Sequence, residues 1–193
     1  MPDGNHAPVS FDSEPLVLVD EHDNEVGHLP KADAHRGHGT LHRAFSVFLF
    51  DDLGRTLLQQ RSASKPLWPG YWSNSCCSHP RRGEETDEAV ERRLREELGV
   101  RAELRYVYKF RYQADFGDVG AEHELCHVYV GTTSDTVEVH PDEISDWRWI
   151  APDELDRELA AHPERFTPWF RMEWRELRTE RADEVESLLE HCA

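Results

Sequence analysis

The chain has 193 residues, of which 39 are acidic and 22 basic, and its formal net charge at neutral pH is −17. Such an acidic protein is a poor match for nucleic acid or an acidic membrane, because both partners are polyanions. Only three of the basic residues are lysines. This composition predicts adaptation to concentrated salt, with an ordinary acidic protein as the alternative. A melting temperature that stays flat between low and molar KCl would contradict the halophilic interpretation.

The length fits a single domain with a substantial core of its own. We expect residues 1–14 to be a flexible N-terminal lead-in and residues 15–193 to form the domain. No apolar run approaches the ~20 residues that a membrane span requires. The polar N-terminus also lacks the apolar centre of a secretory signal. Four cysteines do not make a disulfide framework in a chain of this size, so we expect reduced thiols and a cytoplasmic location.

Apolar patterns predict the first strands of the chain. Residues 16–20 (LVLVD) are expected to form a short strand. Residues 31–42 are rich in glycine and histidine, which favours a loop over a site. Residues 44–50 (AFSVFLF) are predicted to be a buried strand, which turns at residues 51–54 into another strand at residues 56–60.

Strands and helices also alternate in the second half of the chain. A charged helix is expected to end at Gly99, and strands are predicted at residues 103–112, 123–130 and 147–150, with a loop at 113–121. Further helices are predicted from Pro152, at residues 167–178 and at residues 182–191. This order lacks the regular period of a doubly wound sheet. We therefore expect an α/β fold in which a mixed β-sheet is sandwiched between helices.

Residues 67–100 contain several groups that can take part in catalysis or bind a metal ion. A Trp-Pro-Gly turn leads to Cys77 and His79, and a carboxylate-rich helix follows. A thiol that can exchange a proton and an imidazole that can bind a metal therefore lie two residues apart. The helix alone also has a plain structural interpretation. Two arginines at positions 92 and 93 precede two glutamates by four residues, which is the spacing of surface salt bridges.

The same helix resembles the Nudix box, G-x5-E-x7-R-E-U-x-E-E-x-G-U, where U is apolar. Two positions depart from the pattern, because Ser78 replaces the first glycine and Arg93 the first glutamate. Box glutamates hold divalent cations in the hydrolases of this superfamily. An arginine there indicates a retained fold with altered chemistry. The matching residues are Glu84, Arg92, Leu94, Glu96, Glu97, Gly99 and Val100.

Residues 74–80 follow the pattern N-S-x-C-x-H-P and resemble the active-site stretch of type I isopentenyl-diphosphate isomerases, which are degenerate Nudix proteins. The resemblance runs from about residue 16 to about residue 174. It implies a Nudix-like fold and an enzyme that interconverts isopentenyl and dimethylallyl diphosphate through a carbocation. Other motifs in the same order are L-H-x-A-F-S (41–46), R-x-x-S-K-x-x-W-P-G (61–70), F-R-Y (110–112), E-x-E-x-C (122–126) and P-W (168–169).

The resemblance also implies two metal ions. A mixed set of imidazoles and carboxylates suits Mn²⁺ or Mg²⁺, with Zn²⁺ as a further candidate. Each histidine alone is more often a surface residue in a chain with 12 of them. Glu97 and the Cys77 carbonyl match ligands of a Mg²⁺ ion that bridges the diphosphate. The implied ligands of the first ion are His35, His42, His79, Glu122 and Glu124.

Proton exchange is assigned to Cys77 and Glu124 by the same resemblance. Glu124 is expected to be the metal-linked acid, assisted by Tyr112, and Cys77 the thiolate base, although which group protonates and which deprotonates stays open. Trp169 matches a residue whose ring stabilises the cation. Cys76 falls at a variable position of the motif. The implied diphosphate-binding residues are Lys31, Arg61, Lys65 and Arg93.

Two alternatives share parts of this pattern. A Nudix pyrophosphohydrolase would also use Mg²⁺ and a diphosphate, but it needs a glutamate where Arg93 stands and has no use for Cys77. A catalytically inactive binding module would be expected to lack some of these groups. The expected partner is a small isoprenoid diphosphate, with no nucleic acid and no membrane. The oligomeric state stays open, with a monomer as one candidate.

Overall fold

The computed structural model describes residues 9–190, so the first eight residues of the predicted lead-in, and His191 of the last predicted helix, lie outside it. Within this range nine strands join in one mixed sheet. The strands are β1 (Pro15–Val19), β2 (Glu25–Pro30), β3 (His42–Phe50), β4 (Thr56–Arg61), β5 (Trp72–Ser73), β6 (Cys76–Ser78), β7 (Glu103–Phe116), β8 (Gly120–Thr132) and β9 (Ile144–Ile150). The helices are α1 (Lys31–Ala34), α2 (Thr86–Leu98), α3 (Pro152–Ala161), the 3₁₀ turn η1 (Pro163–Arg165), α4 (Pro168–Thr179) and α5 (Ala182–Glu190).

Strand β3 is the centre of the sheet. It pairs in parallel with β8 along its whole length, and its other edge pairs antiparallel with β1, β6 and β4 in turn. Side chains of β3 alternate between two cores, with Ala44 and Phe48 in one and Phe45 and Val47 in the other. Burial on both faces explains why this strand is an almost unbroken apolar run.

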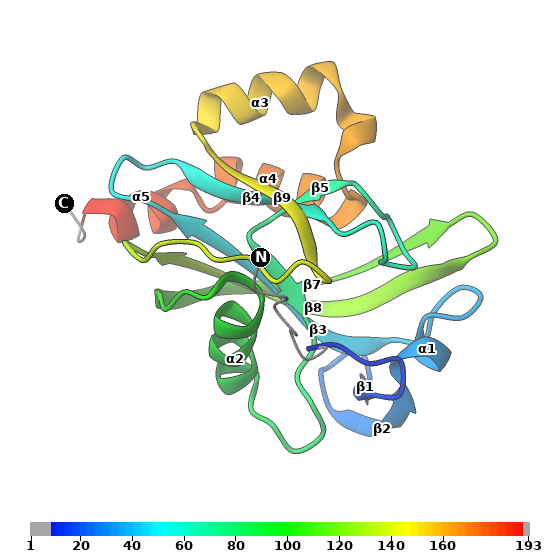
Figure 1. The fold of residues 1–193 in the computed structure, drawn as a ribbon. Helices are drawn as coiled ribbons and strands as arrows, with labels where there is room; N and C mark the ends of the chain where they lie inside the picture. The colour runs from blue at the N-terminus through cyan, green and yellow to red at the C-terminus, as the bar shows by residue number, and fades with distance from the viewer. Residues whose placement is uncertain (1–8, 191–193) are drawn as a thin grey trace, which may run out of the picture.

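Helices cover both faces of the sheet, as Figure 1 shows. Helix α2 packs Leu94 and Leu98 against one face, together with Phe45. Helices α3, α4 and α5 cover the other face, where the Phe170 ring of α4 stacks 5.9 Å from that of Phe48. Gly99 ends α2 in the left-handed conformation that glycine adopts most readily. The predicted α/β fold with a mixed sheet sandwiched between helices is therefore confirmed.

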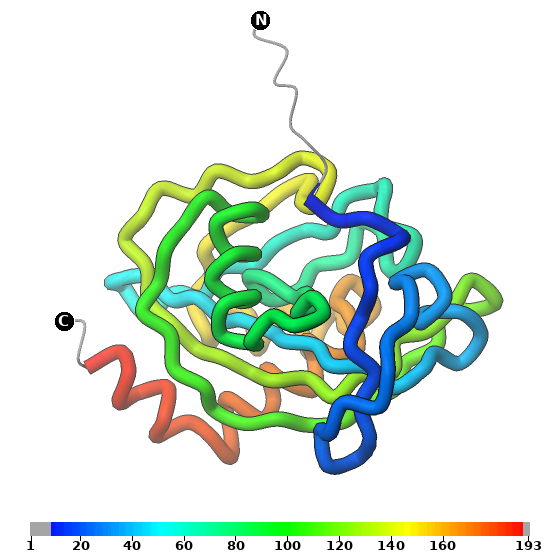
Figure 2. The backbone as a smooth tube through the Cα atoms, turned by 90° about the horizontal axis from the view of Figure 1, so that it is seen from below, coloured from blue at the N-terminus to red at the C-terminus, as the bar shows by residue number. Residues whose placement is uncertain are grey.

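The two ends of the molecule carry different elements. Figure 2 shows α5 at the opposite end of the molecule from the β1–β2 hairpin and α1. No helix within residues 9–190 is long and apolar enough to cross a membrane. The site described below lies at the end that carries α1 and the tip of the β7–β8 hairpin.

The predicted loop at residues 113–121 is wrong. Strand β7 continues to Phe116 and β8 begins at Gly120, with paired residues that include Ala114 opposite Glu122. Gly117, with φ of 55°, marks only the tip of the hairpin. The predicted loop at residues 31–42 also contains the short helix α1, and the strands β2, β5 and β6 were not anticipated.

Candidate active site

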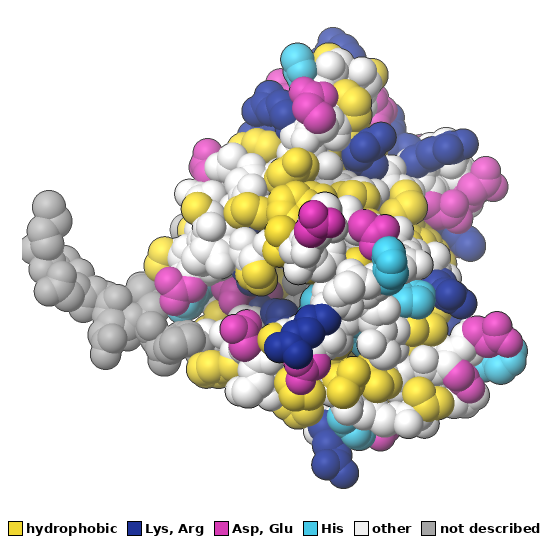
Figure 3. All heavy atoms as spheres, turned by 90° about the vertical axis from the view of Figure 1, so that its right-hand side faces the viewer, with side chains coloured by type: hydrophobic (Ala, Val, Ile, Leu, Met, Phe, Trp, Pro, Cys, Tyr) yellow, Lys and Arg dark blue, Asp and Glu magenta, His cyan; other side chains and the backbone are white. Residues whose placement is uncertain are grey.

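A cavity of about 350 Å³ collects most of the residues singled out by the sequence. Its walls come from α1, the turn after β4, β6, the β7–β8 hairpin and the start of α4. On the face that Figure 3 shows, acidic, basic and histidine side chains lie among hydrophobic ones around a recess. The candidate residues that line the cavity are Lys31, His35, Arg61, Lys65, Cys77, His79, Arg93, Tyr112, Glu122, Glu124 and Trp169.

Three histidines and two glutamates meet at the inner end of the site. One ligand atom from each of His35, His42, His79, Glu122 and Glu124 lies within 4.8 Å of all the others. His42 is fully buried and does not line the cavity, so it closes the cluster from beneath. The period of two in β8 turns both glutamates to one face of the strand. This group could hold a metal ion.

Backbone carbonyls orient two of these imidazoles. His35 Nδ1 lies 2.7 Å from the Lys31 carbonyl and His42 Nδ1 lies 2.7 Å from the Thr40 carbonyl. A carbonyl only accepts, so each Nδ1 carries a proton and each ring turns its Nε2 toward the other members of the cluster. His35 Nε2 then faces Glu122 at 2.8 Å, and His42 Nε2 faces the Nε2 of His79 at 3.2 Å.

Burial would lower the pKa of His35, but Glu122 outweighs burial and raises it, so the carboxylates favour a positive charge at this place. A divalent ion satisfies such a set, because neutral imidazole nitrogens and carboxylate oxygens are its usual ligands. The contact of His35 and His42 to a carbonyl through Nδ1 is also the arrangement that orients metal ligands. The donor set therefore fits the metal that the sequence implied.

Glu124 is held in its ionised form by its neighbours. Burial alone would raise its pKa, but His42 and the Tyr112 hydroxyl outweigh burial and lower it. The Tyr112 hydroxyl donates a 2.6 Å hydrogen bond to one carboxylate oxygen, and His79 Nε2 lies 3.0 Å from the other. Glu124 thus carries contacts from three sides and lies on the cavity wall.

Cys77 lies on β6 and therefore reaches the cavity from the edge of β3 opposite to β8. Strand β6 places Cys77 opposite Ser46, whereas β8 places Glu124 opposite His42 on the other edge of β3. Burial raises the pKa of Cys77 to about 12, even though Arg61 favours the thiolate. Burial of the sulfur thus favours the thiol in the free protein, while Arg61 opposes this effect.

Arg61 is fixed by the Trp-Pro-Gly turn. Its guanidinium donates to the carbonyls of Leu67 and Trp68, at 2.9 and 3.2 Å, and Nη1 lies 3.9 Å from the Cys77 sulfur. Trp68 adopts a φ of 47°, an uncommon conformation for a bulky residue. The strained turn thus aims two carbonyls at one arginine, which is a typical arrangement near functional sites.

Aromatic rings form the wall beside Cys77 and Glu124. The Trp169 ring lies 5.2 Å from Trp68 and 6.2 Å from Tyr112, measured between centroids. The Arg61 guanidinium carbon lies 5.3 Å from the centroid of Trp169. The ring face of Trp169 therefore already accommodates a positive charge in the free protein.

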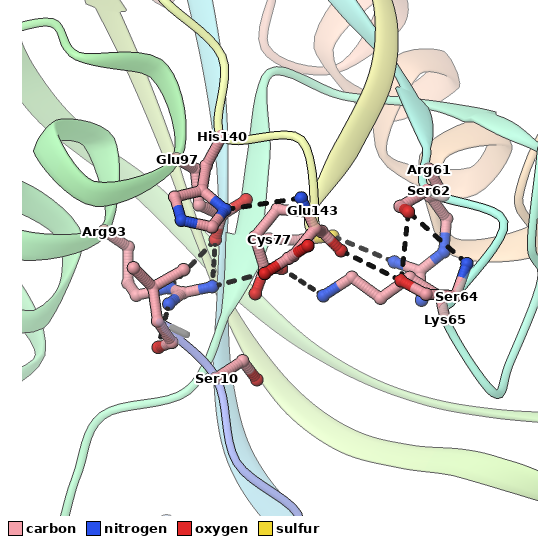
Figure 4. Close-up of polar contacts among 12 residues, drawn as sticks. Ser10, Arg61, Ser62, Ser64, Lys65, Cys77, Arg93, Glu97, His140 and Glu143 are labelled. Carbon is pink, nitrogen blue, oxygen red and sulfur yellow. Dashed lines mark hydrogen bonds and ion pairs between the residues drawn. The ribbon is translucent and has the colours of Figure 1, made fainter. Parts of the chain in front are cut away.

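Cations crowd the outer end of the cavity. Lys31 and Lys65 line it with Arg93, which comes from the middle of α2. Burial and the neighbouring Lys65 lower the pKa of Lys31 to about 8. Glu97 lies behind Arg93 rather than on the wall, and its carboxylate accepts from the guanidinium at 2.6 Å. Figure 4 shows these contacts.

Two contributions to this end were missed from the sequence. Glu143, just before β9, forms ion pairs with Lys65 and Arg93. Residues within the predicted lead-in (1–14) also take part, because the Val9 carbonyl accepts from Arg93 at 2.7 Å and the Ser10 hydroxyl accepts from Lys31 at 2.8 Å. Neither segment has a recognisable motif, since isolated acidic and small polar residues are common throughout this chain.

The mixed sheet and helix α2, which carries the box motif, are those of a NUDIX domain. The family model of this domain matches residues 40–170. Among solved structures, a Deinococcus radiodurans protein superimposes with a TM-score of 0.63 at 30% identity, covering 77% of this chain and 90% of its own. A MutT protein from Methanosarcina mazei has a TM-score of 0.60 at 17% identity over 73% of this chain and 95% of its own, which supports the fold alone.

Curated relatives narrow the class. Isopentenyl-diphosphate Delta-isomerase 1 of Photorhabdus laumondii is 47% identical over 166 residues, which are 85% of this chain and 94% of the relative. Isopentenyl-diphosphate Delta-isomerase of Halorhodospira halophila is 45% identical over 160 residues, or 82% of this chain and 91% of the relative. The chain belongs to the isopentenyl-diphosphate Delta-isomerase family of Nudix proteins.

Proposed function

We propose that this protein interconverts isopentenyl diphosphate and dimethylallyl diphosphate. The observation that carries the proposal is that a cluster of cations, a thiol and a carboxylate that could exchange protons, and an aromatic wall all line one cavity. Each is needed for a different part of an isoprenoid diphosphate. Family membership supports the reaction, and the geometry supports the roles that we propose for individual residues.

The outer end of the cavity would bind the diphosphate. Lys31, Arg61, Lys65 and Arg93 supply donors from four separate segments, and diphosphate oxygens are strong acceptors of charge-assisted hydrogen bonds. Glu97 and the Cys77 carbonyl are the proposed ligands of a Mg²⁺ ion that accompanies the diphosphate. In the free protein Glu97 is paired with Arg93, so binding of that ion would require Glu97 to share its carboxylate.

The hydrocarbon end would lie between Cys77 and Glu124. Isomerisation adds a proton to the terminal carbon of the double bond, forms a tertiary cation, and removes a proton from the carbon on the other side. Because the reaction is reversible, each group must donate in one direction and accept in the other. Cys77 and Glu124 reach the cavity from opposite edges of β3, which suits transfer at two separate carbons. Trp169 would stabilise the cation without attacking it.

The histidine and glutamate cluster would hold a divalent ion, with Mn²⁺ or Mg²⁺ as the proposed ions and Zn²⁺ as the further candidate. Such an ion supplies Lewis acidity, which promotes proton release from groups bound to it. Glu124 belongs both to this cluster and to the cavity wall, so it connects the metal to the substrate. Tyr112 fixes the oxygen of Glu124 that does not face His79.

One assay separates this function from the two alternatives. The metal-loaded protein is incubated with isopentenyl diphosphate, and the products are separated. Dimethylallyl diphosphate is the expected product. Release of inorganic phosphate or pyrophosphate would instead indicate a Nudix hydrolase, and binding without turnover would indicate an inactive module.

A further inference from the structure

Glu143 joins two of the cations at the outer end of the cavity. It lies in the segment between β8 and β9 and is only 4% exposed. Its carboxylate accepts from Lys65 Nζ and lies 3.4 Å from Arg93 Nη2. Figure 4 shows Glu143 between Arg93, which comes from α2, and Lys65, which comes from the turn after β4. One carboxylate therefore links two otherwise separate elements.

Backbone contacts fix the position of this carboxylate. The Glu143 amide donates to the His140 carbonyl at 3.0 Å, and the Ser62 amide donates to the Glu143 carbonyl at 2.9 Å. The Ser64 hydroxyl donates to the Asp142 carbonyl at 3.2 Å. The turn that carries Lys65 is thus tied directly to the segment that carries Glu143.

The two cations depend on Glu143 to different degrees. Arg93 is also held by Glu96 and Glu97 and by the Val9 carbonyl. For the Lys65 ammonium, Glu143 is the one ion-pair partner found among residues 9–190. Lysine has a flexible four-carbon stem that otherwise samples many rotamers. Glu143 therefore determines where the Lys65 ammonium points.

Glu143 reaches Lys65 and Arg93 from behind the cavity wall. Both cations line the cavity, whereas Glu143 does not. These two cations hold the pKa of Glu143 low, at about 2, despite its burial, so it remains an anion under all ordinary conditions. A permanent anion behind the wall leaves the remaining donors of both side chains available to a ligand in front of it.

We propose that Glu143 is a positioning residue for substrate, which acts by holding Lys65 beside Arg93 so that both meet the same diphosphate. The inference rests on the proposed diphosphate site. If the lysine is already held in place, binding an anion does not cost the conformational entropy of ordering its side chain. The negative charge of Glu143 itself opposes an incoming anion, so the net effect of removing Glu143 decides between positioning and simple repulsion.

The test compares Glu143→Ala with Asp142→Asn in the metal-loaded enzyme. Asp142 is an exposed carboxylate one residue away, so the control removes the same charge at nearly the same place. We expect Glu143→Ala to raise KM for isopentenyl diphosphate and the inhibition constant of inorganic pyrophosphate by about tenfold, with kcat within about threefold of normal. Asp142→Asn should change neither constant. Partial unfolding would lower the apparent kcat and leave KM unchanged, so KM reports positioning even if the variant is less stable.

A double-mutant cycle with Lys65 completes the test. If Glu143 acts through Lys65, then Glu143→Ala should raise KM by less than about twofold in a Lys65→Ala background. An unchanged or lowered KM in the single Glu143 variant would overturn the inference, as would a full additional effect in that background. If Lys65→Ala itself leaves KM and pyrophosphate inhibition unchanged, the diphosphate site is misassigned, which is a different failure.

Discussion

Tyr112 and Glu124 are directly opposite each other on β7 and β8, and the tyrosine hydroxyl donates a 2.6 Å hydrogen bond to the carboxylate. The pair thus lies across a hairpin whose register fixes both side chains on the same face. Because Glu124 also belongs to the histidine cluster, Tyr112 is one contact away from the metal position. Among residues 9–190, this carboxylate is the one hydrogen-bond acceptor found for the hydroxyl.

Tyr112→Phe tests the contribution of this hydrogen bond. The ring stays in place, but Glu124 loses a donor that lowers its pKa, and a hydrogen bond to a charged group contributes about 1.5–3 kcal/mol. We expect kcat to fall at least about tenfold and the melting temperature to fall by several degrees, so turnover is measured well below the melting transition. Tyr108→Phe is the matched control, because the Tyr108 hydroxyl on the same strand has no hydrogen-bond partner among the described residues. Equal losses in both variants would contradict the assignment.

The adjacent cysteines should respond in opposite ways to replacement by serine. Cys77 lines the cavity, whereas Cys76 is fully buried in the core beneath α2. Cys77→Ser should lower kcat by about 10²–10⁴-fold, the usual contribution of a positioned acid or base. Cys76→Ser should retain its specific activity but lose about 1–3 kcal/mol of stability, because it buries a hydroxyl. Turnover and urea denaturation of both variants separate the two effects, and the reverse pattern would shift the motif by one residue.

The part of the fold that could be predicted from sequence is the part with strong periodicity. The apolar run of β3 and the Gly99 stop of α2 are local signals, and the structure has both. The β7–β8 hairpin was predicted too short because Gly117 and its acidic neighbours are also typical of a longer loop. Only cross-strand pairing, such as Ala114 with Glu122, extends these strands, and one sequence does not reveal pairing.

Site residues that belong to recognisable motifs could be predicted from sequence. Site residues that only tertiary packing brings to the cavity could not. Cys77 and His79 belong to a recognisable stretch, and the structure brings both to the cavity. Glu143 has no such context, since it is one of 39 acidic residues. The thiol state of Cys77 was equally hidden, because burial of the sulfur raises its pKa and burial is a property of the fold.

Metal binding should depend on His42 more than on any exposed histidine. His42 is buried, with Nδ1 on the Thr40 carbonyl and Nε2 in the cluster. Loss of an outer-shell partner weakens metal affinity by about 10–100-fold. We expect His42→Ala, which removes a direct ligand, to weaken it by more than this. His38→Ala is the control, because its side chain is 88% exposed. Metal content after dialysis against a graded chelator is the measurement, and full stoichiometry in His42→Ala would exclude it as a ligand.

The charge of Lys31 should limit substrate capture at alkaline pH. Its pKa in the free protein is lowered to about 8 by burial and by the neighbouring Lys65. Below that pH the ammonium is present and can bind a diphosphate; above it the neutral amine cannot, so kcat/KM should fall as pH rises through about 8. A bound diphosphate stabilises the ammonium, so kcat should stay level to higher pH. Burial raises the pKa of Cys77 to about 12, which is too high to explain this fall in kcat/KM. Lys31→Arg keeps its charge, so kcat/KM of this variant should no longer fall near pH 8. If the fall persists in that variant, another group causes it.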